Sequence, residues 1–298
     1  MKKEKDVIKT DAKVRKSNIF VHGRYRFGLH EQKILLQIIS KVRTDEKEFS
    51  PYFVSWEDLK NISKGYLDTT KKIDESCEKL KNKTIKVTSG QVEKNFGFLS
   101  GWDTIPGKGV HFRIDPGMKS MLLDLLQDGN FTLYRLECAI ALGSSYSIRF
   151  YELLKSEQWK SQPIIIDLKK IKWCLDIEEE NKTFINFSNF RVHILEKAQK
   201  DFKKYTDITF TYKVIKEGRK VVALSISINE NKTYQRTVQG VVAKKAAEGV
   251  KPGQIVIIAG KEYIVSDGGI HYNEGAMPTG MLNQLIWEGK AKIKEIIG

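Results

Sequence analysis

Side chains suited to contacting a polyanion gather between residues 184 and 205, in the segment FINFSNFRVHILEKAQKDFKKY. With about 100° of rotation per residue, the apolar side chains of 187–205 fall on one side of a helix. These are Phe187, Phe190, Ile194, Leu195, Ala198, Phe202 and Tyr205. The opposite side carries Asn189, His193, Glu196, Lys200, Lys203 and Lys204. Because a core helix would be handicapped by so much charge, the pattern predicts a helix that packs on one side and faces a polyanion on the other.

The polar side of this helix combines two kinds of chemistry. Asn and Arg side chains make directed, often bidentate hydrogen bonds to base edges, whereas lysines suit phosphate groups as point charges. In a helix-turn-helix the N-terminal part of the recognition helix meets the bases, so Ser188, Asn189 and His193 are expected near the floor of the major groove. Arg191 lies at the margin of the apolar side. It either braces the preceding helix or reaches a phosphate, and both roles remain open.

A second basic element follows directly along the chain. Residues 206–228 alternate apolar and polar side chains around Glu217-Gly218-Arg219, which predicts a β-hairpin. Two basic elements that the fold would place on one side favour a DNA surface over the alternative, a merely solvated charged face. The candidate DNA-binding residues are Ser188, Asn189, Arg191, His193, Lys197, Lys200, Lys203, Lys204, Lys213, Lys216, Arg219 and Lys220.

The elements that would position these residues occur in the same order twice. The first series is a helix at 30–42, a short helix capped by Ser55, a helix at 69–81 and β-rich segments joined by a glycine-rich turn. The second is a helix from residue 145, a short strand and helix at 163–175 with Asp167 in the capping position, the helix at 187–205 and the hairpin. Helix, helix, helix and β-ribbon is the order of a winged helix-turn-helix, and its recurrence indicates an internal duplication.

The first unit offers a weaker version of the basic surface. Its third helix opens with Thr and Lys residues, but Asp74, Glu75 and Glu78 dilute the charge. We therefore expect phosphate anchoring or protein contacts there rather than base reading. The candidate secondary phosphate contacts are Thr69, Lys71, Lys72, Lys79 and Lys81.

These patterns predict an α+β protein with two tandem winged-helix domains and a small C-terminal β-rich module. The expected divisions are a polar N-terminal arm at 1–16, a first winged-helix domain at 17–130, a second, repeat-reading domain at 131–231, a linker at 232–249 and the module at 250–298. In the module we expect a hairpin turning at Gly260-Lys261 and a short amphipathic helix within 278–297. The apolar residues of that helix, Met281, Leu282, Leu285, Ile286 and Trp287, either close a small core or dock a host protein.

Composition agrees with a nucleic-acid partner and limits the chemistry. Lys plus Arg number 51 against 37 Asp plus Glu, a net charge of +14, which suits a phosphate-rich partner.

Three unpaired cysteines and no signal or membrane-spanning segment indicate a protein of the cytoplasm. The five histidines form no His-x-His or HExxH pattern, and GWDTIPGKG at 101–109 fails the phosphate-loop spacing, so it is interpreted as a turn between wing strands. We expect no catalytic residues, metal or cofactor, which leaves a rolling-circle nickase as a remote alternative.

The series SIRFYELLK (147–155), FSNFRVHILEKAQKDF (187–202) and TDITFTYKVIKEGRKVVALSISI (206–228), together with KVRKSNIFVHGRYRFGLHEQKILLQIISKV (13–42), resembles the iteron-binding plasmid replication initiators, the Rep or RepB-type family. The resemblance covers about 13–230. It implies a recognition helix at 187–203 and a wing at 213–221. His193 stands where a second arginine is frequent in the family, and SISINEN departs mildly from the usual aromatic-containing last strand.

The resemblance also implies a function. Initiators of this kind bind directly repeated origin DNA (iterons), open an adjacent AT-rich stretch, and recruit host initiation factors and the replicative helicase. Their dimers, joined mainly through the first domain, commonly repress the initiator's own gene and so take part in plasmid copy control. The expected partners are therefore double-stranded DNA, a second copy of the chain and host replication proteins, with no membrane, in a bacterial cytoplasm. The alternative is a winged-helix transcriptional regulator without initiation activity, because fold does not fix function.

Overall fold

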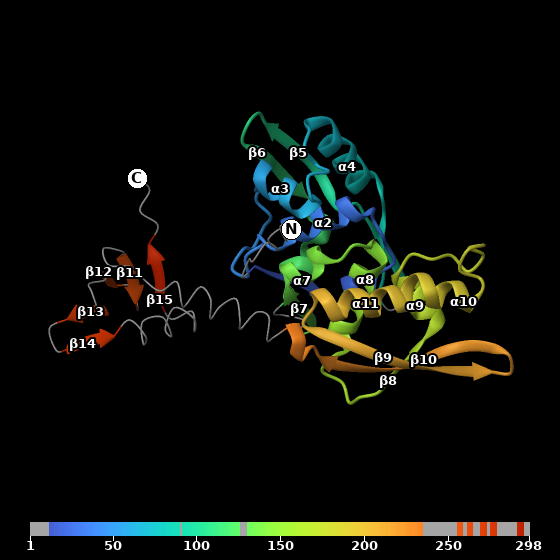
Figure 1. Cartoon of the computed structure of the whole chain (residues 1–298). Helices are drawn as coiled ribbons and strands as arrows, with labels where there is room; N and C mark the ends of the chain where they lie inside the picture. The colour runs from blue at the N-terminus through green and yellow to red at the C-terminus, as the bar shows by residue number, and fades with distance from the viewer. Residues whose placement is uncertain are drawn as a thin grey trace, which may run out of the picture. The chain divides into compact units, whose positions relative to one another are not determined.

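The computed structural model describes residues 12–89, 91–125 and 130–234, and beyond them the backbone of five short strands. The chain divides into two compact units, Met1–Asn231 and Lys232–Gly298. In the described part of the chain, no helix is both long and apolar enough to span a bilayer. The larger unit holds both winged helices (Figure 1).

The first winged helix follows the predicted order. Its elements are α1 (Asn18–Val21), α2 (Leu29–Ile39), β2 (Tyr52–Ser55), α3 (Trp56–Ser63), α4 (Thr70–Asn82), β3 (Ile85–Ser89), β4 (Val92–Phe96), β5 (Leu99–Ile105) and β6 (Gly109–Ile114). The predicted cap of α3 is confirmed, since the Ser55 hydroxyl accepts a hydrogen bond from the Asp58 backbone N–H at 3.1 Å. The glycine-rich stretch at 101–109 is confirmed as a strand–turn–strand, with Gly107 in the turn at φ +71°.

A two-stranded sheet joins the ends of this domain. It pairs β1 (Lys13–Ser17) with β7 (Phe131–Arg135) in antiparallel register, and the chain reaches β7 through a 3₁₀ turn, η1 (Pro116–Met118), and α5 (Lys119–Leu122). The last residues of the expected polar arm thus lie in a strand, and Val14 and Lys16 are fully buried. After β7 come α7 (Leu136–Ala141) and the first helix of the second winged helix, α8 (Ser145–Glu157).

The second winged helix repeats the strand order of the first. Its elements are α8, β8 (Ile164–Asp167), α9 (Leu168–Cys174), α10 (Phe187–Phe190), the π-helical turn η2 (Arg191–Glu196), α11 (Lys197–Tyr205), β9 (Ile208–Glu217) and β10 (Lys220–Glu230). The sheet order β8-β10-β9 matches β2-β6-β5 of the first domain, because in each the strand before the second helix pairs with the last strand of the wing. Asp167 occupies the predicted N-cap position of α9, but its side chain makes no capping hydrogen bond.

A fully buried arginine ties the two winged helices together. Arg149 of α8 donates hydrogen bonds to the carbonyls of Val21 at 2.9 Å and Gly23 at 3.0 Å in the first domain. It also donates to the Cys174 carbonyl at the end of α9, at 3.2 Å. One guanidinium thus joins α1 and the segment after it to the end of α9.

The same arginine belongs to a buried charge cluster. Glu152 accepts from Arg149 and from Lys16 of β1, each at 2.5 Å, and all three side chains are fully buried. The Tyr134 hydroxyl of β7 donates to the same carboxylate. Burial lowers the pKa of Lys16 to about 8, although the Glu152 carboxylate beside it acts in the opposite direction. The cluster anchors the β1–β7 sheet to α8.

A half-buried set of ion pairs adds to this junction. Asp176, which follows α9 with φ +52°, accepts from Arg24 at 3.0 Å and pairs with Lys83 at 3.1 Å. Both cations come from the first domain, so this carboxylate holds the end of α9 against it.

The C-terminal unit contains β11 (Ile255–Ile258), β12 (Lys261–Ile264), β13 (Gly269–Tyr272), β14 (Gly275–Pro278) and β15 (Ala291–Lys294). The predicted hairpin strands are present, since β11 pairs antiparallel with β12, but Lys261, predicted in the turn, is the first residue of β12 and lies opposite Ile258. The amphipathic helix predicted within 278–297 is wrong at 291–294, where AKIK forms a strand paired with β11. Its alternating side chains fit a strand, and pairing with β11 satisfies the backbone groups. Pro278, the first residue of the predicted helix, ends β14, and residues 279–290 and 295–297 lie outside the described part.

Candidate nucleic-acid interface

The predicted recognition helix exists and is seated as its apolar pattern indicates. The segments α10, η2 and α11 follow one another without a break from Phe187 to Tyr205. The buried side chains are Phe190, Ile194, Leu195, Ala198 and Phe202. The centroid of the Phe202 ring lies 6.4 Å from the ring centroid of Phe150 on α8 and 5.3 Å from that of Phe210 on β9. Phe187 and Tyr205, at the two ends, are only half-buried.

The candidate residues of this helix all face outward. The exposed side chains are Ser188, Asn189, Arg191, His193, Lys197, Lys200, Lys203 and Lys204. The helix therefore presents its amide, imidazole and ammonium groups away from the core that its aromatic side helps to form.

The helix is not regular, which the assumption of 100° per residue did not foresee. From Arg191 to Glu196 it is π-helical, with hydrogen bonds that span five residues instead of four. Around this wider turn Arg191, Val192 and His193 are exposed in succession. The turn therefore enlarges the outward surface just where a helix-turn-helix approaches the bases.

Asn189 is held by the loop that leads into the helix. Its amide nitrogen donates to the Thr183 carbonyl at 2.9 Å. The loop is itself braced by Asn181, whose Oδ1 accepts from the backbone N–H groups of Thr183 and Phe184 at 3.1 Å each. An amide has two hydrogens and an acceptor oxygen, so Asn189 keeps one donor and its oxygen for a ligand while the first hydrogen fixes its orientation.

Arg191 has a partner that the sequence did not indicate. Its guanidinium lies 3.4 Å from the Glu196 carboxylate, and both side chains are about half exposed. Burial raises the pKa of the Tyr212 hydroxyl on β9, with Glu196 raising it further and Arg191 lowering it. The ion pair of Arg191 thus joins two residues of the same π-helical turn.

The lysines of α11 differ in their intramolecular contacts. Lys197 pairs with Asp201 one turn later at 3.5 Å, and Asp201 also accepts from Ser147 of α8 at 2.9 Å. Lys204 lies over the Tyr205 ring, 5.0 Å from its centroid. These contacts orient two of the four ammonium groups on the exposed face.

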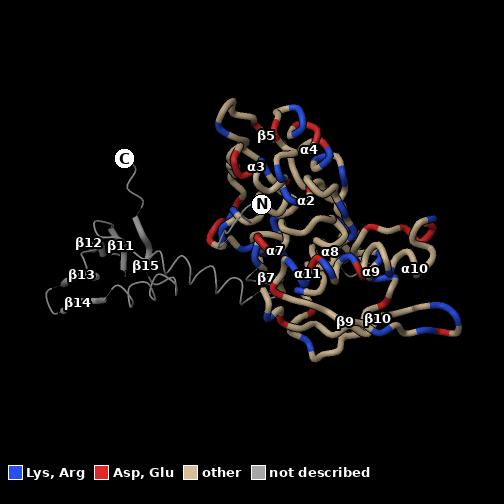
Figure 2. Tube along the Cα trace, in the orientation of Figure 1, with Lys and Arg blue, Asp and Glu red and all other residues tan. Residues whose placement is uncertain are grey.

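The wing carries the second group of cations. Gly218 has φ +58°, the left-handed conformation that a two-residue hairpin turn requires and that glycine adopts without cost. In the strand register Glu217 lies opposite Lys220, so the turn has two residues. The exposed candidates are Lys213, Lys216, Arg219 and Lys220, and Figure 2 shows Lys and Arg along the far part of the β9–β10 hairpin.

Several candidates in the first domain already have partners. The Thr69 hydroxyl caps α4 by accepting from the Lys72 backbone N–H at 3.4 Å. Lys72 pairs with Asp68 at 2.9 Å and lies over the Tyr66 ring, while Lys79 pairs with Glu31 at 3.3 Å. Lys71 and Lys81 are exposed on the same helix. Two of the four lysines of this helix, Lys72 and Lys79, thus already have an acidic partner.

Other reactive groups serve the core. Cys77, Cys138 and Cys174 are buried, as their apolar helical positions predicted, and burial raises the pKa of the Cys77 and Cys174 thiols. Burial, with Lys170 nearby, lowers the pKa of His22 to about 4. Among the described residues, no three His, Cys, Asp or Glu side chains are grouped so that they could bind a metal.

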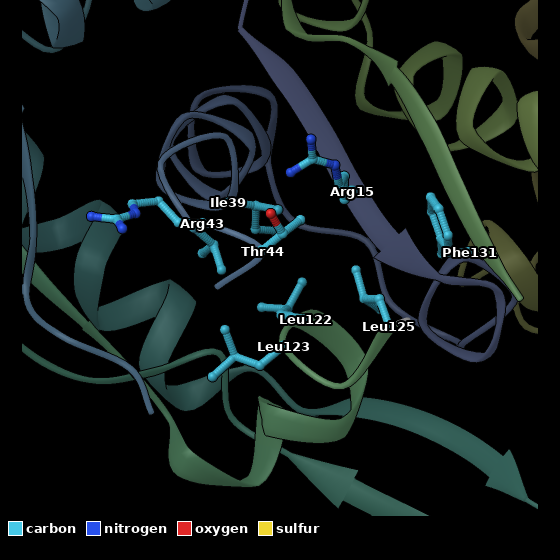
Figure 3. A pocket seen from close by; sticks show the side chains of 9 residues that line it. Arg15, Ile39, Arg43, Thr44, Leu122, Leu123, Leu125 and Phe131 are labelled. Carbon is cyan, nitrogen blue, oxygen red and sulfur yellow. The ribbon is translucent and has the colours of Figure 1, made fainter. Parts of the chain in front are cut away.

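A pocket lies away from this surface, in the first domain. Figure 3 shows it beside β1, the end of α2 and α5, with Leu122, Leu123 and Leu125 on one side. Arg15 and Phe131, from β1 and β7, are also in its lining. The lining is mainly apolar and does not include any of the candidate DNA-binding residues.

Comparisons with known proteins point to one family. The family model described as "Initiator Replication protein, WH1" matches residues 13–155, and the one described as "Initiator Rep protein, WH2" matches 167–228. A crystal structure of the Pi initiator protein in complex with iteron DNA shares the fold, with 18% identity and a TM-score of 0.63 over 76% of this chain and all of that one. A structure of domains 2 and 3 of RctB is 13% identical, with a TM-score of 0.44 over 68% and 82% of the two chains. A search of curated proteins found no match.

Proposed function

The chain belongs to the family of initiator replication proteins, as its sequence resemblance indicated, and we propose that it initiates plasmid replication by binding directly repeated origin DNA. The repeats are the counterpart of the iteron DNA bound by the Pi initiator protein. Its place of action is the bacterial cytoplasm, where the plasmid is.

The observation that carries this proposal is the exposed polar side of residues 188–204, which continues into the basic wing. Asn189 and His193 face the base edges from the N-terminal half of the helix, with Ser188 beside them. Arg191 reaches a phosphate from the edge near the wing. The phosphate contacts are assigned to Lys197, Lys200, Lys203, Lys204, Lys213, Lys216, Arg219 and Lys220.

The first domain has a supporting part in this proposal. Lys71 and Lys81 contact phosphates from α4, with weaker contributions from Thr69, Lys72 and Lys79 because these have intramolecular partners. Binding then promotes opening of adjacent AT-rich DNA and recruits host initiation factors and the replicative helicase. A dimer joined through the first domain represses the initiator's own gene. None of these steps requires a catalytic residue of this chain.

The test is a salt series of binding to two duplexes, one with the direct repeats of the plasmid origin and one of the same composition but scrambled. Phosphate contacts alone carry no sequence information, so affinity for the repeats should exceed affinity for the scrambled duplex at every salt concentration. Equal affinities throughout would reject the proposal. Specific binding to a single inverted repeat, with no directly repeated site near an AT-rich region, would instead favour the transcriptional regulator.

A further inference from the structure

One of the residues exposed by the π-helical turn is apolar. Val192 lies between Arg191 and His193, and 46% of its surface is exposed. The neighbouring apolar side chains of the helix, Phe190 and Ile194, are buried. Val192 therefore contributes little to the core, and an isopropyl group on the outward face gains nothing from water.

The helix geometry places this valine among the base-reading candidates. Val192 is three residues after Asn189, a spacing that puts two side chains on one face of a helix. It belongs to the half of the helix that enters the major groove when a helix-turn-helix binds DNA. It lies within the π-helical turn, where Arg191, Val192 and His193 are exposed in succession.

We propose that Val192 is a specificity-determining residue that contacts the C5-methyl group of a thymine in the repeat. The inference rests on the proposed function and specifies part of its readout. In the major groove only thymine presents a methyl group, which apolar side chains contact. A base that presented an amino group or carbonyl to the isopropyl group would lose water without gaining a hydrogen bond. The contact thus selects thymine and disfavours the other bases.

The experiment removes the methyl group from the DNA and the isopropyl group from the protein. Duplexes with the footprinted origin repeat are compared with duplexes in which each thymine in turn is replaced by deoxyuridine. The wild-type protein is expected to lose about threefold to fivefold in affinity when one particular thymine is replaced. This factor corresponds to the free energy of burying about one methyl group. Val192→Ala should lose a similar factor on the thymine duplex and nothing further on the deoxyuridine duplex.

Val214→Ala is the matched control, because Val214 is also a partly exposed valine, 39% exposed, but lies on β9 outside the helix. The Val214→Ala variant should lose affinity on the deoxyuridine duplex by the same factor as the wild-type protein. If Val192→Ala also shows that loss, or binds all duplexes like the wild type, the inference is wrong. These outcomes leave the preference for repeat over scrambled DNA intact, so they are distinguishable from failure of the proposed function.

Discussion

At the scale of single residues, buried and exposed charges have different roles in this protein. Arg149, Glu152 and Lys16 are fully buried, and both cations are bonded to the Glu152 carboxylate, so they hold elements together. The lysines of α11 are exposed, and one of them, Lys197, pairs with Asp201. A charge in the first group is costly to leave unpaired, whereas one in the second costs little to remove from the folded state.

The buried group makes a prediction about stability. Glu152→Gln would leave Lys16 and Arg149 buried without their carboxylate, and should lower the free energy of unfolding by about 3–5 kcal/mol. Urea denaturation measures this directly. The matched control is Glu178→Gln, since Glu178 is 73% exposed and lies 3.7 Å from Arg24. It should change stability by no more than about 0.5 kcal/mol. Equal effects of the two substitutions would contradict a structural role for the cluster.

The exposed group makes a prediction about specificity. Asn189→Ala should reduce the preference for repeat over scrambled DNA by about 1–3 kcal/mol, because a base-edge contact is lost. Lys203→Ala should weaken binding to both duplexes alike and reduce the salt slope by about 1, because one phosphate contact is lost. Fluorescence anisotropy at several salt concentrations measures both. If both variants showed the same loss on specific and scrambled duplexes, this division of roles would be wrong.

At the scale of elements, the proposed DNA surface contains two local departures from regular geometry. The π-helical turn exposes three consecutive residues of the recognition helix. The two-residue turn of the wing needs a left-handed residue, Gly218, and its extended strands then project Lys216 and Arg219 beyond the core. Both features serve the surface more than the stability of the domain.

The wing turn can be tested separately from the core. Gly218→Val places a β-branched residue at φ +58°, which strains the turn by about 1–2 kcal/mol. Affinity for all duplexes should fall, while the melting temperature of the domain core changes little. Gly218→Asn is the matched control, because asparagine tolerates the left-handed conformation and open space surrounds the position. If the valine variant binds DNA as tightly as the asparagine variant, the wing does not position phosphate contacts.

At the scale of the whole molecule, the residues after the second wing divide into those that complete the recognition helix and those that form the other unit. Asn231 caps the end of α11, since its amide donates to the carbonyls of Phe202 at 3.1 Å, Lys203 at 3.0 Å and Thr206 at 2.8 Å. Asn231 is also the last residue of the larger compact unit.

Two truncations separate these parts. A chain ending at residue 234 keeps the Asn231 cap and should bind repeat DNA with unchanged affinity. A chain ending at residue 230 leaves buried carbonyls of the helix end unpaired. Its free energy of unfolding should therefore be about 1–3 kcal/mol lower. Calorimetry and DNA binding measure the two effects. Loss of binding in the longer truncation would assign the C-terminal unit to the DNA interface, whereas retained binding with lost plasmid replication would support docking of a host protein.

The sequence alone determined the element order of the two winged helices and the family, because their signals are local. The 3.6-residue period placed Phe190, Ile194 and Phe202 on one side, and period-two alternation around Gly218 predicted the wing. Only the tertiary structure decided that Asn189 bonds to Thr183, that Arg191 pairs with Glu196 and that Arg149 joins the two domains. A π-helical turn arises from packing at both ends of a helix, and Arg149 meets residues more than a hundred positions away. Neither leaves a period or a spacing in the chain, and the strand at 291–294 likewise depends on its partner, β11.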